Sequence, residues 1–346
     1  MNLKIIDTSN MLKEIESLPF QIEESVEIIN DYKFEIKNFE KINNVLVVGM
    51  GGSGIGGDIV NSIISDKTPI PFYVVRDYNL PSWVDENSLV ICVSYSGNTE
   101  ETISCFEEAI HRKSYIVGIT SGGILQEKLN KFGLDLISIP KKKPPRASIG
   151  YISTLILLVL EKNNLIPNSS EKYLLETSSK LKTLTNTFNK MENKNPTFFL
   201  AKEIFKTVPI IYGDFKYTSS IALRWRGQIE ENSKMISFHN TLPEMNHNEI
   251  VGYENNNNLF DKLSIIWLKD KNIHPRTSLR QKYSLQLLSE NISNQFEVES
   301  HGESLIERIF YLIYWGDWLS FWLAICHGTD PTPVKRIEKL KKKLVR

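Results

Sequence analysis

A loop rich in glycine, between residues 49 and 57, is the part of this sequence best suited to binding an anion. The stretch Val45–Asp58 reads VLVVGMGGSGIGGD, an apolar run followed by the glycines and then by a helical pattern. Glycines let backbone N–H groups approach an anion closely, and a helix N-terminus favours negative charge. Gly49, Gly51 and Gly54 match the spacing of the dinucleotide-binding fingerprint, but such a loop also suits a sugar phosphate or a simple tight turn.

A second candidate loop, Ser94–Thr99, reads SYSGNT and follows another apolar run. Hydroxyl and backbone N–H groups at the end of a strand can hold a phosphate monoester by hydrogen bonds alone, whereas the alternative is an ordinary capped helix start. A dinucleotide site would also need an acidic residue at the end of the next strand, where Arg76 precedes Asp77 and the signal is ambiguous. The two loops together favour a phosphate site over a dinucleotide site.

Alternating strand and helix patterns predict the scaffold that would position these loops. We expect short helices at 11–18 and 21–29, then strands at 45–48, 70–75, 89–94, 115–119 and 134–139, with helices at 101–111 and 122–130. This order predicts a parallel, doubly wound α/β sheet, which binds ligands at the carboxyl ends of its strands. The basic run Lys141–Arg146 that ends this unit is either a linker or a segment that places Arg146 beside an anion.

The second half of the sequence predicts another unit of the same kind. Tyr151–Leu160 is either a helix or a strand, and Ser170–Met191 is a connecting helix. We expect strands at 208–212, 234–238, 263–268 and 295–298, and helices at 218–234, from about 302, and at 333–344. The predicted fold is therefore α/β, with two doubly wound parallel-sheet domains of three αβα layers and a C-terminal helix. The expected domains are 1–150 and 195–346, with a helical connection at 151–194.

Composition sets further bounds on function. The 346 residues carry no net charge, which gives no general attraction to nucleic acid or to a membrane. Three widely spaced cysteines form no metal or disulfide pattern, and the first residues show no apolar secretion signal, so a cytoplasmic protein is expected. The apolar stretch Ile309–Cys326 approaches the length of a membrane span, but its aromatic residues are spread throughout, which favours a buried or dimer-interface helix.

The loop motifs resemble a known fold and, with three later blocks, a known family. GMGGSGIGGD followed by SYSGNTEET resembles the sugar isomerase (SIS) fold. The blocks RWRGQIEENSK (224–234), PEMNHNEIVGY (243–253) and DPTPVKRIEKLKKKL (330–344) resemble the bifunctional phosphoglucose/phosphomannose isomerase family. The resemblance covers nearly the whole chain, and the combination of blocks is specific. One departure is that the family's Asn-Glu-Asn reads Glu230-Glu231-Asn232 here, with the glutamate kept.

The resemblance implies interconversion of glucose 6-phosphate and mannose 6-phosphate with fructose 6-phosphate through a cis-enediol(ate). It assigns proton transfer to Glu231 and ring opening to His247, roles that suit a desolvated carboxylate and a group titrating near neutrality. It assigns Arg146 to stabilising the negative charge of the enediolate. It places Lys339 near the ring oxygen, or Lys341 if the alignment of the last block is shifted. Without the flanking blocks, Glu231 would be a solvated acid and His247 an ordinary loop histidine.

The resemblance also implies a substrate-binding set, which consists of Gly52, Ser53, Ser94, Ser96, Thr99 and Thr332. Thr332 matches a position that leaves room for both epimers, although it could instead cap the last helix. The family implies no cofactor and no metal, a sugar phosphate as partner, and a homodimer with active sites shared between subunits. Two other hypotheses are a non-catalytic SIS protein that senses a sugar phosphate and an NAD(P)-dependent dehydrogenase.

Overall fold

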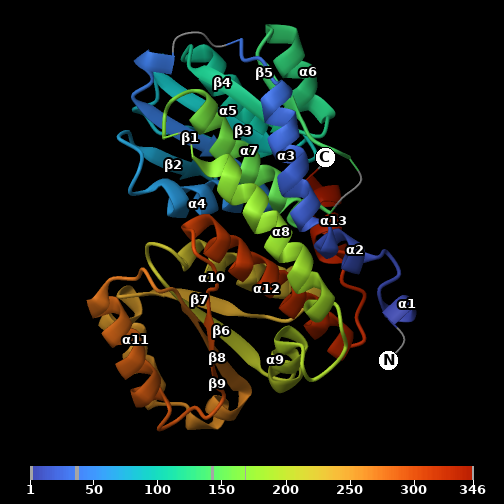
Figure 1. Cartoon of the computed structure of the whole chain (residues 1–346), viewed down its shortest axis with the longest axis vertical. Coiled ribbons are helices and arrows are strands. Elements are labelled where there is room, and N and C mark those ends of the chain that lie inside the picture. The colour runs from blue at the N-terminus through green and yellow to red at the C-terminus, as the bar shows by residue number, and fades with distance from the viewer. Residues whose placement is uncertain (1–2, 36–38, 142–143, 168, 345–346) are drawn as a thin grey trace. The chain divides into compact units, whose positions relative to one another are not determined.

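The chain folds into two compact units, each built around its own parallel sheet (Figure 1). A computed structural model describes residues 3–35, 39–141, 144–167 and 169–344, so Lys142 and Lys143 of the basic run lie outside the described residues. The N-sheet unit comprises Ser17–Lys182 and His301–Phe310. The C-sheet unit comprises Met1–Glu16, Thr183–Ser300 and Tyr311–Arg346. The domain boundaries predicted near residues 150 and 195 stay predictions.

Five parallel strands in the order β2-β1-β3-β4-β5 form the sheet of the N-sheet unit. They are β1 (Asn44–Val48), β2 (Phe72–Val75), β3 (Ser88–Ser94), β4 (Tyr115–Thr120) and β5 (Asp135–Ser138). The helices are α3 (Leu18–Asp31), α4 (Gly52–Ile64), α5 (Glu100–His111), α6 (Gly123–Phe132), α7 (Ile149–Lys162) and most of α8 (Ser170–Phe188), with short 3-10 turns η1 (Phe39–Lys41) and η2 (Pro145–Ala147). The central strands β1 and β3 are buried along their whole length, which explains their continuous apolar sequences.

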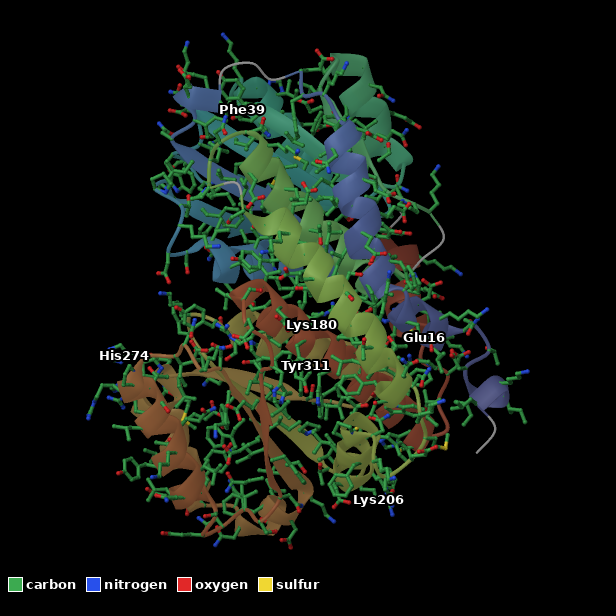
Figure 2. All side chains as sticks on the ribbon, viewed as in Figure 1. Glu16, Phe39, Lys180, Lys206, His274 and Tyr311 are labelled. Atoms are coloured by element: carbon green, nitrogen blue, oxygen red, sulfur yellow. The ribbon has the colours of Figure 1, made fainter. Side chains whose placement is uncertain are left out.

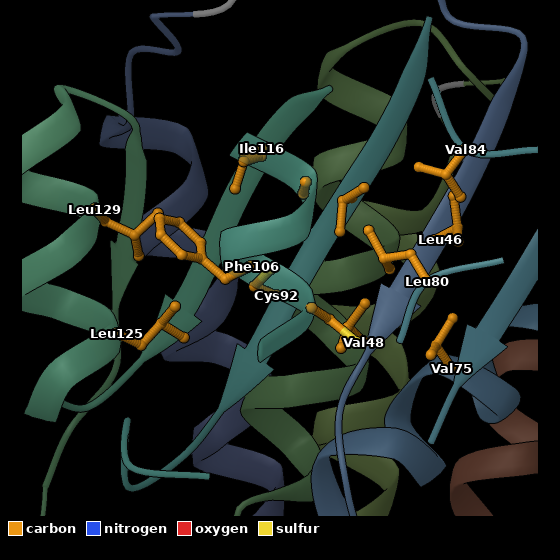
Figure 3. Packing of buried hydrophobic residues seen from close by; sticks show 13 residues of the cluster. Leu46, Val48, Val75, Leu80, Val84, Cys92, Phe106, Ile116, Leu125 and Leu129 are labelled. Atoms are coloured by element: carbon orange, nitrogen blue, oxygen red, sulfur yellow. The ribbon is translucent and has the colours of Figure 1, made fainter. Parts of the chain in front are cut away.

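Side chains that alternate along β1 reach helices on opposite faces of this sheet. Leu46 and Val48 belong to a core cluster with Phe106 of α5 and Leu129 of α6 (Figure 3). Val47 points the other way, where it lies against Gly57 of α4. The predicted α/β layering is therefore confirmed for this sheet.

Four parallel strands in the order β7-β6-β8-β9 form the sheet of the C-sheet unit. They are β6 (Val208–Asp214), β7 (Phe238–Leu242), β8 (Leu263–Lys269) and β9 (Gln295–Glu299). The α-helices are α1 (Leu3–Ile6), α2 (Met11–Glu16), α9 (Pro196–Ile204), α10 (Ser219–Gln228), α11 (Pro275–Leu288), most of α12 (Leu305–Cys326) and α13 (Lys335–Leu344). A π-helical turn η3 (Ile229–Ser233) extends α10, and 3-10 segments η4 (Glu244–His247), η5 (Glu249–Glu254) and η6 (Asn257–Lys262) follow β7.

Two local expectations change in the structure, and one open alternative is decided. The strand predicted at 234–238 is wrong, because Lys234 adopts a left-handed conformation (φ 59°) and pairing with β6 begins only at Phe238, opposite Ile210. The helix predicted at 218–234 ends at Gln228 and continues as the π-helical turn. Tyr151–Leu160, which the sequence left open, lies within helix α7.

Helix α12 is long and apolar enough to cross a membrane by length and composition alone. Within this structure, however, 89% of its most apolar window is buried in the protein. The helix therefore fits the expectation of a buried core helix, with Asp317 engaged in a buried ion pair described below.

Candidate active site

The glycine loop lies at the carboxyl end of β1 and leads directly into α4. A Cβ atom on Gly49 would lie 2.9 Å from the carbonyl oxygen of Val93, so the missing side chain lets this loop pack against the end of β3. Gly51 has φ 50°, a conformation that glycine adopts without steric cost. The loop therefore holds the buried Ser53 and the N-terminal N–H groups of α4 beside the end of the neighbouring strand.

The second predicted loop, Ser94–Thr99, contributes a pair of hydroxyl groups at that strand end. The hydroxyl oxygens of Ser94 and Thr99 lie 2.9 Å apart and share a hydrogen bond. Thr99 immediately precedes α5, but its side chain does not cap that helix, contrary to the ordinary-cap interpretation. Ser96 is exposed on the same loop, and its hydroxyl accepts a hydrogen bond from the Asn98 N–H at 3.2 Å. The loop thus presents hydroxyls beside the N-terminus of α5.

Arg146 lies next to the glycine loop, in the turn η2. A Cβ atom on Gly52 would be 3.2 Å from the Pro145 carbonyl oxygen and 3.4 Å from the Arg146 Cα, so Gly52 allows this close approach. Arg146 is only 5% exposed, which makes it a buried cation beside the glycine loop. The N-sheet unit therefore brings Gly52, Ser53, Ser94, Thr99 and Arg146 to one region, with Ser96 on the same loop.

The residue directly after β2 is a cation, Arg76, whereas a dinucleotide site has an acidic residue at this position. Arg76, the residue directly after β2, forms an ion pair with Asp58 of α4. Burial raises the pKa of Asp58, and the hydrogen bond and charge of Arg76 oppose that shift. The carboxylate of Asp77 accepts a hydrogen bond from its neighbour's N–H, that of Tyr78, at 2.6 Å. These contacts favour the phosphate interpretation over the dinucleotide interpretation.

Glu231 lies in the C-sheet unit, within the π-helical turn η3, and is half-buried. The residues after it are fastened to α12. The Asn232 side-chain amide donates to the Ser320 hydroxyl at 2.9 Å, and the Ser233 hydroxyl donates to the Ser320 carbonyl at 2.8 Å. π-Helical turns inside α-helices occur often at functional sites, because they redirect one side chain. The hydrogen bonds of Asn232 and Ser233 therefore fix the backbone directly after Glu231.

A buried ion pair anchors the helix that leads into this turn. The Arg224 guanidinium of α10 donates to both carboxylate oxygens of Asp317 on α12, at 2.7 and 2.8 Å. The Gln228 amide donates to the same carboxylate at 2.7 Å. Arg224 and Asp317 side chains are each only 3% exposed, so the pair is shielded from solvent.

The segment around Thr332 is held from two sides. The Lys234 ammonium donates to the carbonyl oxygen of Pro331 at 2.9 Å. The carboxylate of Asp330 accepts from the Thr332 N–H at 3.0 Å and from the Thr8 hydroxyl. Helix α13 begins at Lys335, three residues after Thr332, which disagrees with the alternative that Thr332 caps this helix.

His247 ends the 3-10 segment η4 and is exposed, and a buried polar cluster holds the chain just after it. The Glu249 carboxylate accepts from the Tyr212 hydroxyl at 2.5 Å and from the Asn240 amide. The Tyr212 and Tyr253 hydroxyls lie 2.6 Å apart. Burial raises the pKa of Tyr253 to about 12, and burial together with Tyr253 and Glu249 raises the pKa of Tyr212. Both phenols are therefore neutral and able to donate.

Two further observations concern residues that sequence reasoning left open or passed over. Lys339 and Lys341 both lie exposed on α13, so their placement does not choose between the two registers. Lys234 and Glu249 were not proposed from the sequence, although each lies inside a quoted block, at the end of EENSK and within PEMNHNEI. A lysine just after a helix was the only available signal for Lys234. Among the residues that the structure describes, no group of three or more His, Cys, Asp or Glu side chains could hold a metal ion.

Comparisons with known proteins extend over nearly the whole chain. The family described as bacterial phospho-glucose isomerase C-terminal SIS domain matches residues 193–344. A bifunctional phosphoglucose/phosphomannose isomerase of Caldicellulosiruptor bescii is 40% identical over 336 residues, which cover 96% of this chain and 98% of the relative. A protein of the same name from Aquifex aeolicus is 36% identical over 320 residues, which cover 91% of this chain and 95% of the relative. The C-terminal domain of glucosamine-fructose-6-phosphate aminotransferase from Francisella tularensis shares the fold, with a TM-score of 0.72, 16% identity and coverage of 93% of this chain and 98% of that domain.

Proposed function

The chain belongs to the bifunctional phosphoglucose/phosphomannose isomerase family, and on that premise we propose that it interconverts glucose 6-phosphate and mannose 6-phosphate with fructose 6-phosphate. The reaction moves a proton between carbons 1 and 2 through a cis-enediol(ate). The observation that carries the proposal is Glu231, a carboxylate held half-buried in a π-helical turn that side-chain hydrogen bonds fasten to α12. A positioned carboxylate can act as the general base in such a transfer.

The N-sheet unit supports recognition of the phosphate group. The hydroxyls of Ser53, Ser94, Ser96 and Thr99, with the N–H groups at the starts of α4 and α5, would hold the phosphate oxygens by hydrogen bonds. Gly52 contributes a backbone position without a side chain. Arg146 would stabilise the negative charge that develops on the enediolate oxygens, since a fixed cation in a buried setting stabilises developing charge.

The remaining assignments follow the family and are part of the proposal. His247 would open and close the sugar ring, because imidazole can donate and accept a proton near neutral pH. Lys339, or Lys341 in the alternative register, would act near the ring oxygen. Thr332 would leave room for carbon 2 to present either face to Glu231, so that one base serves both epimers. The reaction needs no cofactor and no metal in this scheme.

We further propose a cytoplasmic homodimer in which active sites are shared between subunits. In such a dimer, His247 would act in the site of the neighbouring chain. Mixed dimers of Glu231→Gln and His247→Ala subunits should then recover part of the activity, because some of their sites carry both functional groups. A monomer in light scattering, or no recovery in verified mixed dimers, contradicts the shared site.

The direct test of the reaction is a coupled assay with glucose 6-phosphate and with mannose 6-phosphate, each run with and without a chelator. We expect turnover of both sugars, unchanged by the chelator. Turnover of glucose 6-phosphate without turnover of mannose 6-phosphate would mean that the enzyme is a glucose 6-phosphate isomerase only. Absence of both activities would favour a non-catalytic sugar-phosphate sensor, and binding of added NADPH would favour a dehydrogenase.

A further inference from the structure

A single lysine side chain connects the segment of Glu231 with the segment of Thr332. The Lys234 ammonium donates to the carbonyl oxygens of Glu231 at 2.6 Å and of Asn232 at 3.2 Å. It also donates to the carbonyl oxygen of Pro331 at 2.9 Å, 97 residues further along the chain. All of these residues belong to the C-sheet unit. The proposed base and the proposed wall of the carbon-2 site therefore have one common anchor.

The local chemistry explains why a lysine takes this position. The last carbonyl groups of a helix have no N–H partner within it, and a cation is stabilised beside them. Lys234 leaves the π-helical turn in a left-handed conformation (φ 59°), which ends the turn and lets its side chain fold back over these carbonyls. An ammonium group has three N–H donors, and it meets three carbonyl oxygens here. Lys234 is an exposed residue, and the hydrogen bonds that connect the two segments all come from its ammonium group.

The segment of Thr332 has a second, independent attachment on its other side. The Asp330 carboxylate accepts from the Thr332 N–H at 3.0 Å and from the hydroxyl of Thr8 near the N-terminus. Lys234 and Thr8 thus bind the two residues that immediately precede Thr332, Lys234 through the Pro331 carbonyl and Thr8 through the Asp330 carboxylate. Loss of either attachment removes one of these two restraints on the Thr332 segment.

We propose that Lys234 is a positioning residue that sets the distance between Glu231 and Thr332, and thereby the relative turnover of mannose 6-phosphate and glucose 6-phosphate. The inference rests on the proposed function. The two substrates differ only at carbon 2, where the proton is removed. The ratio of their turnover rates therefore depends on how carbon 2 fits between Glu231 and Thr332. A change in that distance affects the two epimers unequally, whereas general loss of stability affects them equally.

The test compares Lys234→Met, Lys234→Cys and Thr8→Val with the unaltered enzyme. Methionine keeps an apolar stem and removes the ammonium group, and aminoethylation of the cysteine restores an ammonium at nearly the same reach. Thr8→Val removes the hydroxyl that binds Asp330 at an exposed position and keeps a β-branched side chain. It therefore still tests the Thr332 segment if a Lys234 variant does not fold. Lys206→Met is the matched control, because Lys206 is an exposed lysine of the same unit that lies 5.2 Å from the Phe205 ring (Figure 2).

We measure kcat and KM for both sugars, with a thermal melt for each variant. Lys234→Met should change the ratio of the two kcat values by about fivefold or more, Thr8→Val should shift it in the same direction by less, and Lys206→Met should not change it. Aminoethylation of Lys234→Cys should return the ratio toward that of the unaltered enzyme. The inference is overturned if the ratio stays constant, or if both kcat values fall together without rescue by aminoethylation. Failure of the proposed function is distinct, because the unaltered enzyme would then turn over neither sugar.

Discussion

The hydroxyl pair of Ser94 and Thr99 gives the sharpest prediction about phosphate binding. The two oxygens lie 2.9 Å apart, so one hydroxyl donates its proton to the other. Only one of the two protons then remains to be donated outward to a phosphate oxygen. We expect Ser94→Ala and Thr99→Val each to weaken binding of the sugar phosphate, and the double variant to lose less than the sum of the two.

The magnitude follows from the energy of hydrogen bonds to charged groups. Such a bond contributes about 1.5–3 kcal/mol, which corresponds to a loss of about 10- to 150-fold in affinity for whichever single variant removes the outward donor. The hydroxyl–hydroxyl bond contributes about 0.5–1.5 kcal/mol, so the double variant should bind about 2- to 12-fold more tightly than additivity predicts. This non-additivity distinguishes a paired donor from two independent ones.

The assay is competitive inhibition by a non-isomerisable sugar phosphate, together with KM for fructose 6-phosphate. It is run on the unaltered enzyme, the two single variants and the double variant. Ser114→Ala is the matched control, because Ser114 lies at the amino-terminal end of β4, whereas the two loops lie at the carboxyl ends of their strands, and its hydroxyl donates to the Asp85 carbonyl at 2.8 Å. The control should keep its inhibition constant. Wild-type inhibition constants in both single variants, or strict additivity in the double variant, would refute this account of the phosphate site.

Three further outcomes test other parts of the structure. Asp317→Ala should lower the free energy of unfolding by about 3–5 kcal/mol in urea denaturation, because it leaves the Arg224 charge buried without that carboxylate. Burial, together with the Arg226 charge, lowers the pKa of His239, so the folded state binds fewer protons than the unfolded state. The unfolding free energy should therefore fall as pH drops through about 6.5, and His239→Gln should flatten that fall, as urea titrations at several pH values would reveal. Thr332→Gln should depress mannose 6-phosphate turnover far more than glucose 6-phosphate turnover, and an equal fall in both with a lower melting temperature would limit Thr332 to a structural role.

The parts of the fold that could be predicted are those determined by local sequence. The apolar runs of β1 and β3 are buried on both faces of the sheet, so their sequences indicate strands without reference to distant residues. The loops after these strands carry Gly49 and Ser94, whose residue types are required by close backbone approach and by hydrogen bonding. Local chemistry and position in the sheet agree there, which is why the two loops could be located from the sequence.

The rest depends on contacts between residues far apart in the chain. A helical pattern continues through 218–234, but Ser320 of α12 binds the side chains of Asn232 and Ser233 in the π-helical turn. The link between Lys234 and Pro331 spans 97 residues, and no local pattern predicts it. Glu249 was likewise not recognised, because its partners Tyr212 and Asn240 come from neighbouring strands. Positions of this kind require the tertiary structure.

The central claim is that Glu231 moves the proton at carbon 2, and exchange with solvent tests it most directly. The measurement is incorporation of deuterium from D₂O into carbon 2 of glucose 6-phosphate, for the unaltered enzyme, Glu231→Gln and the neighbouring control Glu230→Gln. Glu230 is exposed and lies 3.7 Å from Arg226, which makes it a matched acid outside the proposed role. We predict a loss of about 10²- to 10⁴-fold in exchange for Glu231→Gln, with sugar-phosphate binding kept and with little change for Glu230→Gln. Exchange at the unaltered rate in Glu231→Gln would contradict the account.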